Sequence, residues 1–403
     1  MPRARRLGFA RSSRKERVVS STKVRAPLRK AGLAAGVAMA MMAPAWPAAA
    51  TERVGSVQKA MEELARTPGV VGAVGGVYID GQSVGLGSAG SRLLGGKGGA
   101  IPAGSRFRIG SQTKQMVATV VLQLVNEGRL GVDDKLADLL PEVVNKDLVT
   151  RADEITVRQM LRHTSGIPDW YSEPKPDGSE GDDPSFDVFD FTTHYRPLDL
   201  VKWSRDRPRT GEPGEKWSYS NTNYTLLGLI IERLTGHDLA TELQRHLFGP
   251  LKMTKTYLPL KPPEGIKGPH GHGYYPDTNG RLRDVDRFNA SIAGAAGGVV
   301  STAHDVSAYQ RAFTQGKLLP PELQRVLTDR LPSGLRAFGS SSNSCGDDLY
   351  IMGGSAPGFL AMTFYSEDGR RQFALSVTLS TKDNSRPGQA MGKAMETVFC
   401  PST

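Results

Sequence analysis

The sequence predicts an α+β fold, in which an antiparallel sheet flanked by helices receives an inserted all-α domain. Two segments rich in β-branched residues, 69–90 and 349–380, lie near opposite ends of the chain. The segment from 111 to about 236 has mainly helical spacing. Strands that enclose a helical middle are expected to meet in one sheet.

The domain boundaries follow from this pattern. We expect one domain over residues 51–403, with its sheet part at about 51–110 and 291–403 and its inserted helical part at about 111–290. We expect the functional site to lie in a cleft between the two parts.

The N-terminal elements read clearly. Val54–Arg66 has helical spacing, Gly69–Asp80 ("GVVGAVGGVYID") reads as a strand, and Gly81–Gly90 reads as its hairpin partner.

The helical middle begins with "GSQTKQMVATVVLQLV" at Gly110–Val125, whose apolar residues predict an amphipathic helix. Further helices are predicted at Thr156–Ser165 and at Asn223–Gly236, the latter ended by its glycine. The acidic segment Ser172–Phe191 lies between them and is expected to be either disordered or a lid. Its charge run is most simply a solvated face.

Strands return near the C-terminus. They are predicted at Leu349–Gly354, Phe359–Asp368 and Arg371–Ser380, with a turn at Glu367–Gly369, and a last helix covers Gly388–Phe399.

The net positive charge of the chain lies in its N-terminal segment. Residues 1–50 contain eleven Lys or Arg and one Glu and so carry the whole net charge of +10. The remainder has 40 basic and 40 acidic residues. A balanced surface does not favour phosphate binding, so no nucleic-acid partner is expected.

Residues 1–50 also read as a secretory signal peptide. A basic stretch precedes an uncharged apolar segment, and Ala48–Ala50 offers a small-residue cleavage site. The alternative is a membrane anchor, but Pro44 and Pro47 interrupt a run barely as long as the ~20 apolar residues that a span needs. We expect a secreted protein.

The chain has two cysteines, Cys345 and Cys400. In an oxidising compartment a disulfide between them is expected, with two separate buried cysteines as the alternative.

Ser111 and Lys114 suggest chemistry at the start of the Gly110–Val125 helix. Residues at i and i+3 share one helix face. A serine needs a base to become nucleophilic, and burial disfavours the ammonium form of a lysine. The Ser111 N–H at the helix start also suits one donor of an oxyanion hole.

Several blocks in order make this pair specific: "FRIGSQTKQ", "QLVNEGRLGVDDKLADLLPE", "ITVRQMLRHTSGIPDW", "PGEKWSYSNTNYTLLGLIIERLTG" and "AAGGVVSTAHDV". Together they closely resemble the penicillin-recognising serine hydrolases of the class C β-lactamase and D-alanyl-D-alanine carboxypeptidase type. The resemblance runs from about Val54 to Cys400 and implies a β-lactamase/transpeptidase-like fold.

The resemblance implies roles for individual residues. Ser111 would be the acylated nucleophile and Lys114 its proton-handling neighbour. In the Tyr-x-Asn element, Tyr219 would act as general base or acid and Asn221 would bind the substrate's amide. A nearby ammonium would favour the tyrosinate that a base requires.

The third element departs from the family's Lys-Thr-Gly or His-x-Gly. Aligning "PGF" at its end places Met352, Gly353 and Gly354 there, as substrate-binding residues, with Ser355 as the second oxyanion donor. Met352 lacks the charge, and Gly353 the hydroxyl, that meet a substrate carboxylate. The departure therefore affects two steps, the binding of a substrate carboxylate and the protonation of the leaving group.

Other polar residues suggest no site. His270 and His272 lie in a Gly- and Pro-rich loop without a nearby carboxylate set, so no metal site is expected. His163 is expected in a structural turn, and Asp133-Asp134 is expected to cap a helix.

The predicted function is that of an exported serine hydrolase that forms an acyl-enzyme at Ser111. The leading specific activity is that of a D-alanyl-D-alanine carboxypeptidase acting on peptidoglycan-type peptides. An esterase or β-lactamase on the same fold is the first alternative, and a non-catalytic penicillin-binding or sensing protein is the second. The expected partner is a small peptide or β-lactam substrate, with peptidoglycan as a further candidate. We expect a monomer without cofactor.

Overall fold

The computed structural model describes residues 54–172, 175–177, 181, 184–331, 333–334, 337–342 and 349–400. The chain divides into two units, Met1–Thr51 and Glu52–Thr403, and all described residues belong to the second. The predicted signal peptide and Cys345 lie outside the described residues. Among the described helices, none has the length and apolar character to cross a membrane.

A single six-stranded antiparallel sheet has the order β2-β1-β10-β9-β8-β7. Its strands are β1 (Val70–Ile79), β2 (Gln82–Gly90), β7 (Ser340–Ser342), β8 (Leu349–Ala356), β9 (Phe359–Ser366) and β10 (Arg371–Leu379). The predicted meeting of the two chain ends is confirmed, because β1 pairs with β10 from Val70 opposite Leu379 to Ile79 opposite Arg371.

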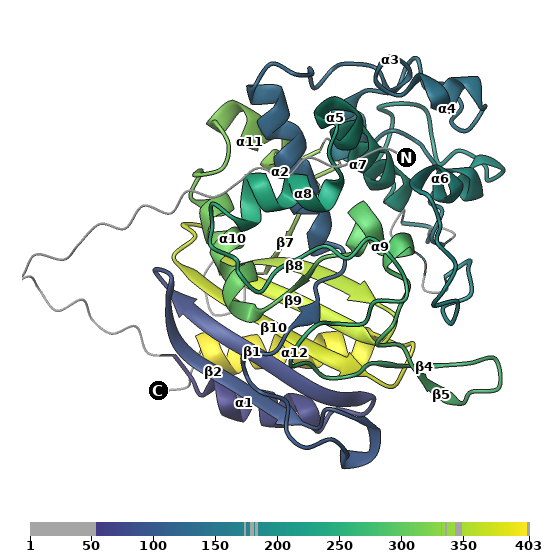
Figure 1. Ribbon diagram of the computed structural model, residues 1–403. Coiled ribbons are helices and arrows are strands. Elements are labelled where there is room, and N and C mark those ends of the chain that lie inside the picture. Colours follow the sequence, from purple (N-terminus) through teal and green to yellow (C-terminus); the bar gives the residue numbers. More distant parts are fainter. Residues whose placement is uncertain are drawn as a thin grey trace, which may run out of the picture. The chain divides into compact units, whose positions relative to one another are not determined.

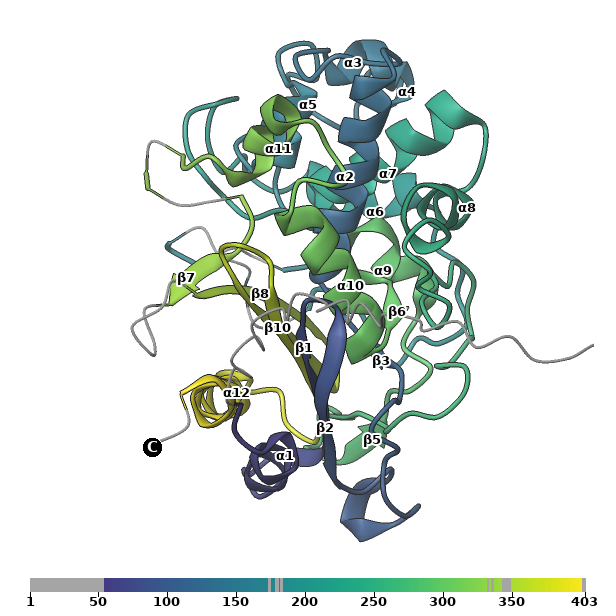
Figure 2. The same ribbon diagram turned by 90° about the vertical axis from the view of Figure 1, so that its left-hand side faces the viewer.

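Both faces of this sheet are covered (Figures 1 and 2). Helices α1 (Val57–Ala65) and α12 (Ser385–Phe399) pack on one face, and α10 (Ala303–Thr314) packs on the other. Strand β1 shows the division, since Ala73 and Val77 belong to the apolar cluster of α1 and α12, whereas Val74 and Tyr78 belong to the main core. This alternation is the period of two expected for a strand.

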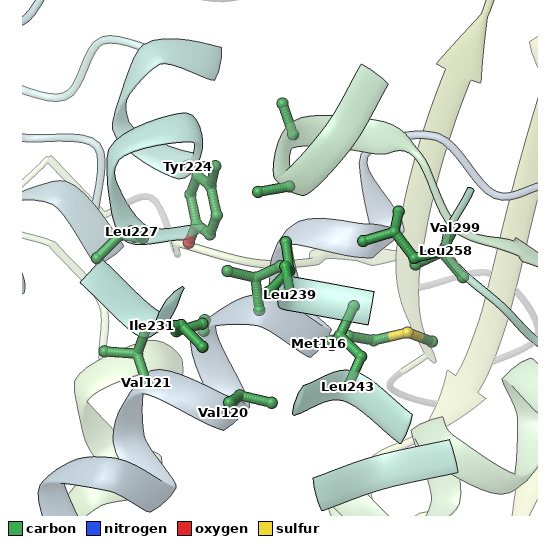
Figure 3. Close-up of a cluster of buried hydrophobic side chains, with 14 of the residues drawn as sticks. Met116, Val120, Val121, Tyr224, Leu227, Ile231, Leu239, Leu243, Leu258 and Val299 are labelled. Atoms are coloured by element: carbon green, nitrogen blue, oxygen red, sulfur yellow. The ribbon is translucent and has the colours of Figure 1, made fainter. Parts of the chain in front are cut away.

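The inserted helical part is built around α2 (Gln112–Asn126). The other helices before residue 250 are α3 (Leu136–Leu139), α4 (Pro141–Asn145), α5 (Val157–Leu161), α6 (Pro197–Arg205), α7 (Asn221–Thr235), α8 (Leu239–Leu243) and the π-turn η2 (Gln244–Phe248). Met116, Val120 and Val121 of α2 lie in one apolar cluster with Tyr224, Leu227 and Ile231 of α7 (Figure 3).

Helix α2 is buried more fully than an amphipathic stripe predicts. Twelve of its fifteen residues are buried, including Lys114. A helix covered on all sides belongs to a core, so the lysine in its first turn is an interior residue.

Small elements join the two parts: η1 (Leu94–Gly96), β3 (Phe107–Arg108), β4 (Tyr274–Pro276), β5 (Leu282–Asp284), α9 (Ala290–Gly297), β6 (Val300–Ser301) and α11 (Pro321–Thr328). The pairing of β3 with β6 fixes the chain immediately before Ser111. The part from residue 290 onward thus holds the three helices α9, α10 and α11 before the strands β7–β10 of the large sheet. Between Ser172 and Phe191 the described residues form neither helix nor strand.

Candidate active site

Ser111 stands at the N-terminus of α2, where strand β8 passes close by. Gly110 has φ 54°, a conformation that favours glycine, and an added Cβ there would lie 2.5 Å from Ser355 N. Gly354 is equally restricted, because an added Cβ would collide with Ile109 O and lie 2.7 Å from Ser111 N. Two glycines therefore allow the backbone of β8 to approach the backbone at the start of α2.

This approach places the two predicted oxyanion donors side by side. The N–H of Ser111 heads the helix, and Ser355 follows Gly354 on β8. Both residues line the same small cleft. Backbone N–H groups held in this way can stabilise a developing oxyanion without reorganisation.

The three predicted catalytic side chains meet at the Ser111 hydroxyl. Lys114 Nζ lies 3.1 Å from Ser111 Oγ, and Tyr219 OH lies 2.7 Å from the same oxygen. Lys114 Nζ also lies 4.8 Å from the centre of the Tyr219 ring. The geometry permits proton exchange among all three groups.

Lys114 has three acceptors. Besides Ser111 Oγ, its Nζ donates to Asn221 Oδ1 at 2.7 Å and to Ala296 O at 2.5 Å. An ammonium carries three hydrogens, so this arrangement suits the charged lysine. Tyr219, the nearer group, is then better placed to accept the Ser111 proton. It would do so as the tyrosinate, whose negative charge the Lys114 ammonium stabilises.

A buried carboxylate, Asp169, holds Asn221 in place. Asn221 donates to it twice, from its backbone N to Oδ1 at 2.9 Å and from Nδ2 to Oδ2 at 3.0 Å. The Asn221 carbonyl oxygen therefore faces Lys114, which gives this residue a task in addition to the predicted contact with the substrate amide. No role was predicted for Asp169 from the sequence, although it lies in the block "ITVRQMLRHTSGIPDW", because nothing in that block indicates its contact with Asn221.

His163 supports the other catalytic side chain. It has φ 55° in the predicted turn, and its buried ring stacks on Tyr219 with centroids 4.6 Å apart. The Ser220 N–H donates to His163 Nδ1 at 3.1 Å, which keeps Nδ1 unprotonated. Burial, with Lys114 as a second cause, lowers the pKa of His163 to about 3. A neutral imidazole thus forms one wall for the tyrosine.

Met352, predicted to bind the substrate, has a buried side chain. It packs in a small apolar cluster with Tyr350, Tyr365 and Phe338. Among the described residues that line the Ser111 cleft, neither Met352 nor Gly353 appears. The assignment of Met352, Gly353 and Gly354 to the substrate stays a prediction.

The cleft itself is largely apolar. Its lining residues are Ser111, Trp170, Tyr171, Asn221, Phe288, Ile292, Ala293, Ala296, Gly297, Ser355, Ala356 and Pro357. From the acidic loop, Phe186 packs against Tyr171 and Phe288, with ring centroids 5.3 and 6.2 Å apart. Sequence reasoning described this loop by its charge and missed the aromatic anchor.

The helix cap predicted at Asp133-Asp134 is wrong. Asp134 accepts from the Gly131 N–H, and Asp133 pairs with Arg158. The N-cap of α3 is Lys135, without a side-chain bond. The disulfide of Cys400 with Cys345 stays a prediction, since Cys345 is outside the described residues.

A serine in contact with a lysine and a tyrosine, beside two converging backbone N–H groups, defines a serine hydrolase of the acyl-transfer type. The chain belongs to the Beta-lactamase family, whose model matches residues 57–394. This is a family of serine hydrolases, and the chain has its β-lactamase/penicillin-binding fold.

Two penicillin-binding proteins are similar in sequence. Identity is 26% over 305 residues with the putative penicillin-binding protein PbpX of Bacillus subtilis (strain 168), covering 71% of this chain and 65% of that protein. It is 30% over 265 residues with penicillin-binding protein 4 of Amycolatopsis lactamdurans, covering 65% and 64%. The chain thus spans just under two thirds of the length of these relatives.

Two solved structures are similar in fold. A D-stereospecific amidohydrolase from Streptomyces sp. gives a TM-score of 0.71 at 29% identity, covering 86% of this chain and 98% of that one. The D-amino acid amidase from Ochrobactrum anthropi SV3 gives 0.69 at 23% identity, covering 85% and 97%. The second likeness shows the fold alone.

Proposed function

We propose that this chain hydrolyses amides or esters of short amino-acid acyl groups whose leaving group carries no charge. Tyr219 acts as the tyrosinate, which the neighbouring Lys114 ammonium favours, and accepts the proton of Ser111 Oγ as that oxygen attacks the substrate carbonyl. The oxyanion forms between the N–H groups of Ser111 and Ser355. The leaving amine or alcohol takes the proton from Tyr219 as the C–N or C–O bond breaks. Water then gives a proton to Tyr219 as its oxygen attacks the acyl carbonyl. Ser111 Oγ takes that proton back as the ester bond breaks and the acid leaves.

The residue at position 352 carries the choice of substrate. Met352 is neutral and buried, whereas the resemblance implies Lys or His at this position. Lys114, the cation beside Ser111, is already bonded to Asn221 Oδ1 and Ala296 O. A substrate carboxylate would lack a charge-assisted hydrogen bond, which contributes ~1.5–3 kcal/mol. Relative to an enzyme with Lys or His at this position, turnover of a carboxylate substrate would fall roughly ten- to a hundredfold, which favours a neutral leaving group.

Two kinds of relatives support neighbouring activities. The structural likeness to a D-stereospecific amidohydrolase supports hydrolysis of amides with D-configured acyl groups. The sequence likeness to penicillin-binding proteins supports the second candidate, a D-alanyl-D-alanine carboxypeptidase. Both candidates require the same acyl-enzyme and differ in the leaving group.

A matched pair of substrates separates the candidates. One peptide ends in D-Ala-D-Ala, and the other is the same peptide ending in D-alaninamide. The proposal expects kcat/KM at least tenfold higher for the amide, whereas preference for the free carboxylate would establish the carboxypeptidase.

Intact-mass spectrometry tests the acyl-enzyme itself. A short-lived adduct is expected in the native chain and none in Ser111→Ala. An adduct that never decays would indicate the non-catalytic, penicillin-binding alternative. Equal turnover by Ser111→Ala would remove Ser111 as the nucleophile. Nitrophenyl esters and cephalosporins in the same assay test the esterase and β-lactamase alternatives.

Export, the Cys345–Cys400 disulfide and a monomeric state complete the proposal. N-terminal sequencing of protein from the culture medium tests cleavage near Ala48–Ala50. Thiol labelling before and after reduction tests the disulfide, and light scattering tests the monomer.

A further inference from the structure

The segment His270-Gly271-His272-Gly273 points two imidazoles to one side. Residues at i and i+2 of an extended segment share a face, and the two rings stack at 5.0 Å with 13° between their planes. The glycines face packed neighbours: an added Cβ on Gly271 would lie 2.8 Å from Ile101 Cδ1, and one on Gly273 would collide with backbone. The alternation of histidine and glycine is thus imposed by packing.

Each imidazole is oriented through its Nδ1. His270 Nδ1 lies 2.6 Å from Gly268 O, and His272 Nδ1 lies 2.7 Å from Asp284 Oδ2. Carbonyl and carboxylate oxygens only accept, so both Nδ1 atoms carry hydrogens. Metal-binding histidines are commonly held in this way, with Nε2 left as the ligand atom.

The carboxylate that sequence reasoning did not find is Asp286. Its Oδ1 lies 3.0 Å from the buried His270 Nε2. One nitrogen from each histidine and one oxygen of Asp286 lie within 4.8 Å of one another. A cation bonded to both His270 and Asp286 at ~2.0–2.2 Å, off the line between them, would span this 3.0 Å separation.

We infer that His270, His272 and Asp286 bind a divalent first-row transition cation of the zinc type. Two imidazoles and one carboxylate suit such cations, whereas Mg²⁺ and Ca²⁺ prefer oxygen ligands alone. Asp284 orients His272, and water completes the coordination. No metal site was expected from the sequence because the two histidines have no carboxylates beside them. The fold brings in Asp284 and Asp286, which lie 12 and 16 residues beyond His272 and His270.

Neighbouring cations leave the site open. Arg92 Nε donates to His270 O at 3.3 Å, and Arg108 Nη2 donates to Asp286 O at 2.7 Å. Both arginines therefore bond backbone carbonyls, and in the described structure neither forms a hydrogen bond with the Asp284 or Asp286 carboxylate.

The inferred role is structural. The ligands lie on either side of the β4–β5 hairpin, at 270–272 and at 286, so a bound cation cross-links the base of that hairpin. None of the three ligands lines the Ser111 cleft. The inference therefore stands apart from the proposed hydrolysis.

The test is Zn²⁺ titration of the untagged chain by calorimetry after chelation, with elemental analysis and thermal unfolding. We expect one Zn²⁺ per chain, no binding of Mg²⁺, and a higher Tm with Zn²⁺. The double variant His270→Ala/His272→Ala should lose at least a hundredfold in affinity together with the rise in Tm. A matched control, His237→Ala/His304→Ala, removes two histidines whose side chains are 50% and 63% exposed, and should bind normally.

A second variant guards against misfolding. Asp286→Asn keeps the shape of the side chain, and we expect at least a tenfold loss of affinity with an unchanged circular dichroism spectrum. No stoichiometric Zn²⁺ in the native chain, or equal affinity in these variants, would overturn the inference.

Discussion

The substitution Asp169→Asn tests whether a buried carboxylate orients the catalytic lysine through Asn221. Asp169 Oδ1 accepts from the backbone N–H groups of Asn221 and Tyr171, at 2.9 and 3.1 Å, and Oδ2 accepts from Asn221 Nδ2 at 3.0 Å. Asparagine has the same size and can keep the first two bonds. The third fails, because two NH₂ groups would then face each other.

Either way of relieving this conflict damages the site. If Asn221 keeps its orientation, it loses the bond that fixes its side chain. If it rotates, its NH₂ group meets Lys114 Nζ, which now lies 2.7 Å from the carbonyl oxygen. One lost hydrogen bond to a charged group corresponds to ~1.5–3 kcal/mol. We therefore expect kcat/KM for a nitrophenyl ester to fall roughly ten- to a hundredfold.

Two comparisons make this result specific. Asp133→Asn removes a surface carboxylate that pairs with Arg158 and should leave kcat/KM unchanged. The exchange Asp169→Asn/Asn221→Asp puts an amide donor opposite a carboxylate again, and the carboxylate can still accept from Lys114. We expect it to recover part of the activity lost by Asp169→Asn. Wild-type activity in folded Asp169→Asn, or strictly additive losses in the double variant, would refute the reasoning.

Three further predictions concern the same site. Gly354→Ala should abolish esterase activity because its Cβ would press on Ser111 N, whereas Gly353→Ala, whose Cβ would meet open space, should retain it; equal activities would contradict the proposed oxyanion geometry. Tyr219→Phe keeps the ring but removes the hydroxyl 2.7 Å from Ser111 Oγ, so acylation measured in single turnovers should slow ~10²–10⁴-fold, and a normal rate would exclude Tyr219 as base. Because burial lowers the pKa of His163 to about 3, the unfolded chain binds the extra proton, and stability present above pH ~6.5 is lost as pH falls toward 3. Between pH 7 and 5.5, the free energy of unfolding measured in urea should fall by ~1 kcal/mol more in the native chain than in His163→Gln. Parallel pH profiles of the two chains would count against this prediction.

Local patterns were sufficient for five of the six strands of the sheet, and the family resemblance was needed for the catalytic side chains. Strands β1, β2 and β8–β10 have apolar or β-branched runs bounded by turns, so their predicted ranges agree with the structure to within a few residues. Ser111, Lys114 and Tyr219 lie in sequence blocks shared with known hydrolases. Strand β7, three serines at a sheet edge, has no such pattern and was not predicted.

The supporting polar residues were hidden from the sequence because their partners are distant along the chain. Asp169 meets Asn221 over 52 residues, and His272 meets Asp284 over 12. Asp169 lies near the end of a block that carries the family resemblance, but that block does not show which residue the acid contacts, and only the fold gives either acid its partner. His163 was correctly placed in a turn, but its stacking on Tyr219 depends on the start of α7, which no local pattern connects to that turn.

The departure at Met352 affects selectivity more than acylation. Strand β8 pairs with β9 along its length, with Met352 opposite Thr363 and Ser355 opposite Leu360, and this pairing is made by the backbone. The Ser355 N–H therefore keeps its place beside Ser111 whatever residue occupies position 352. A lysine or histidine there would put a polar head into the cluster of Tyr350, Tyr365 and Phe338, where burying a charge is costly. This part of the site is consequently built to do without a charge, which is why the neutral leaving group, and not the loss of catalysis, is the consequence we infer.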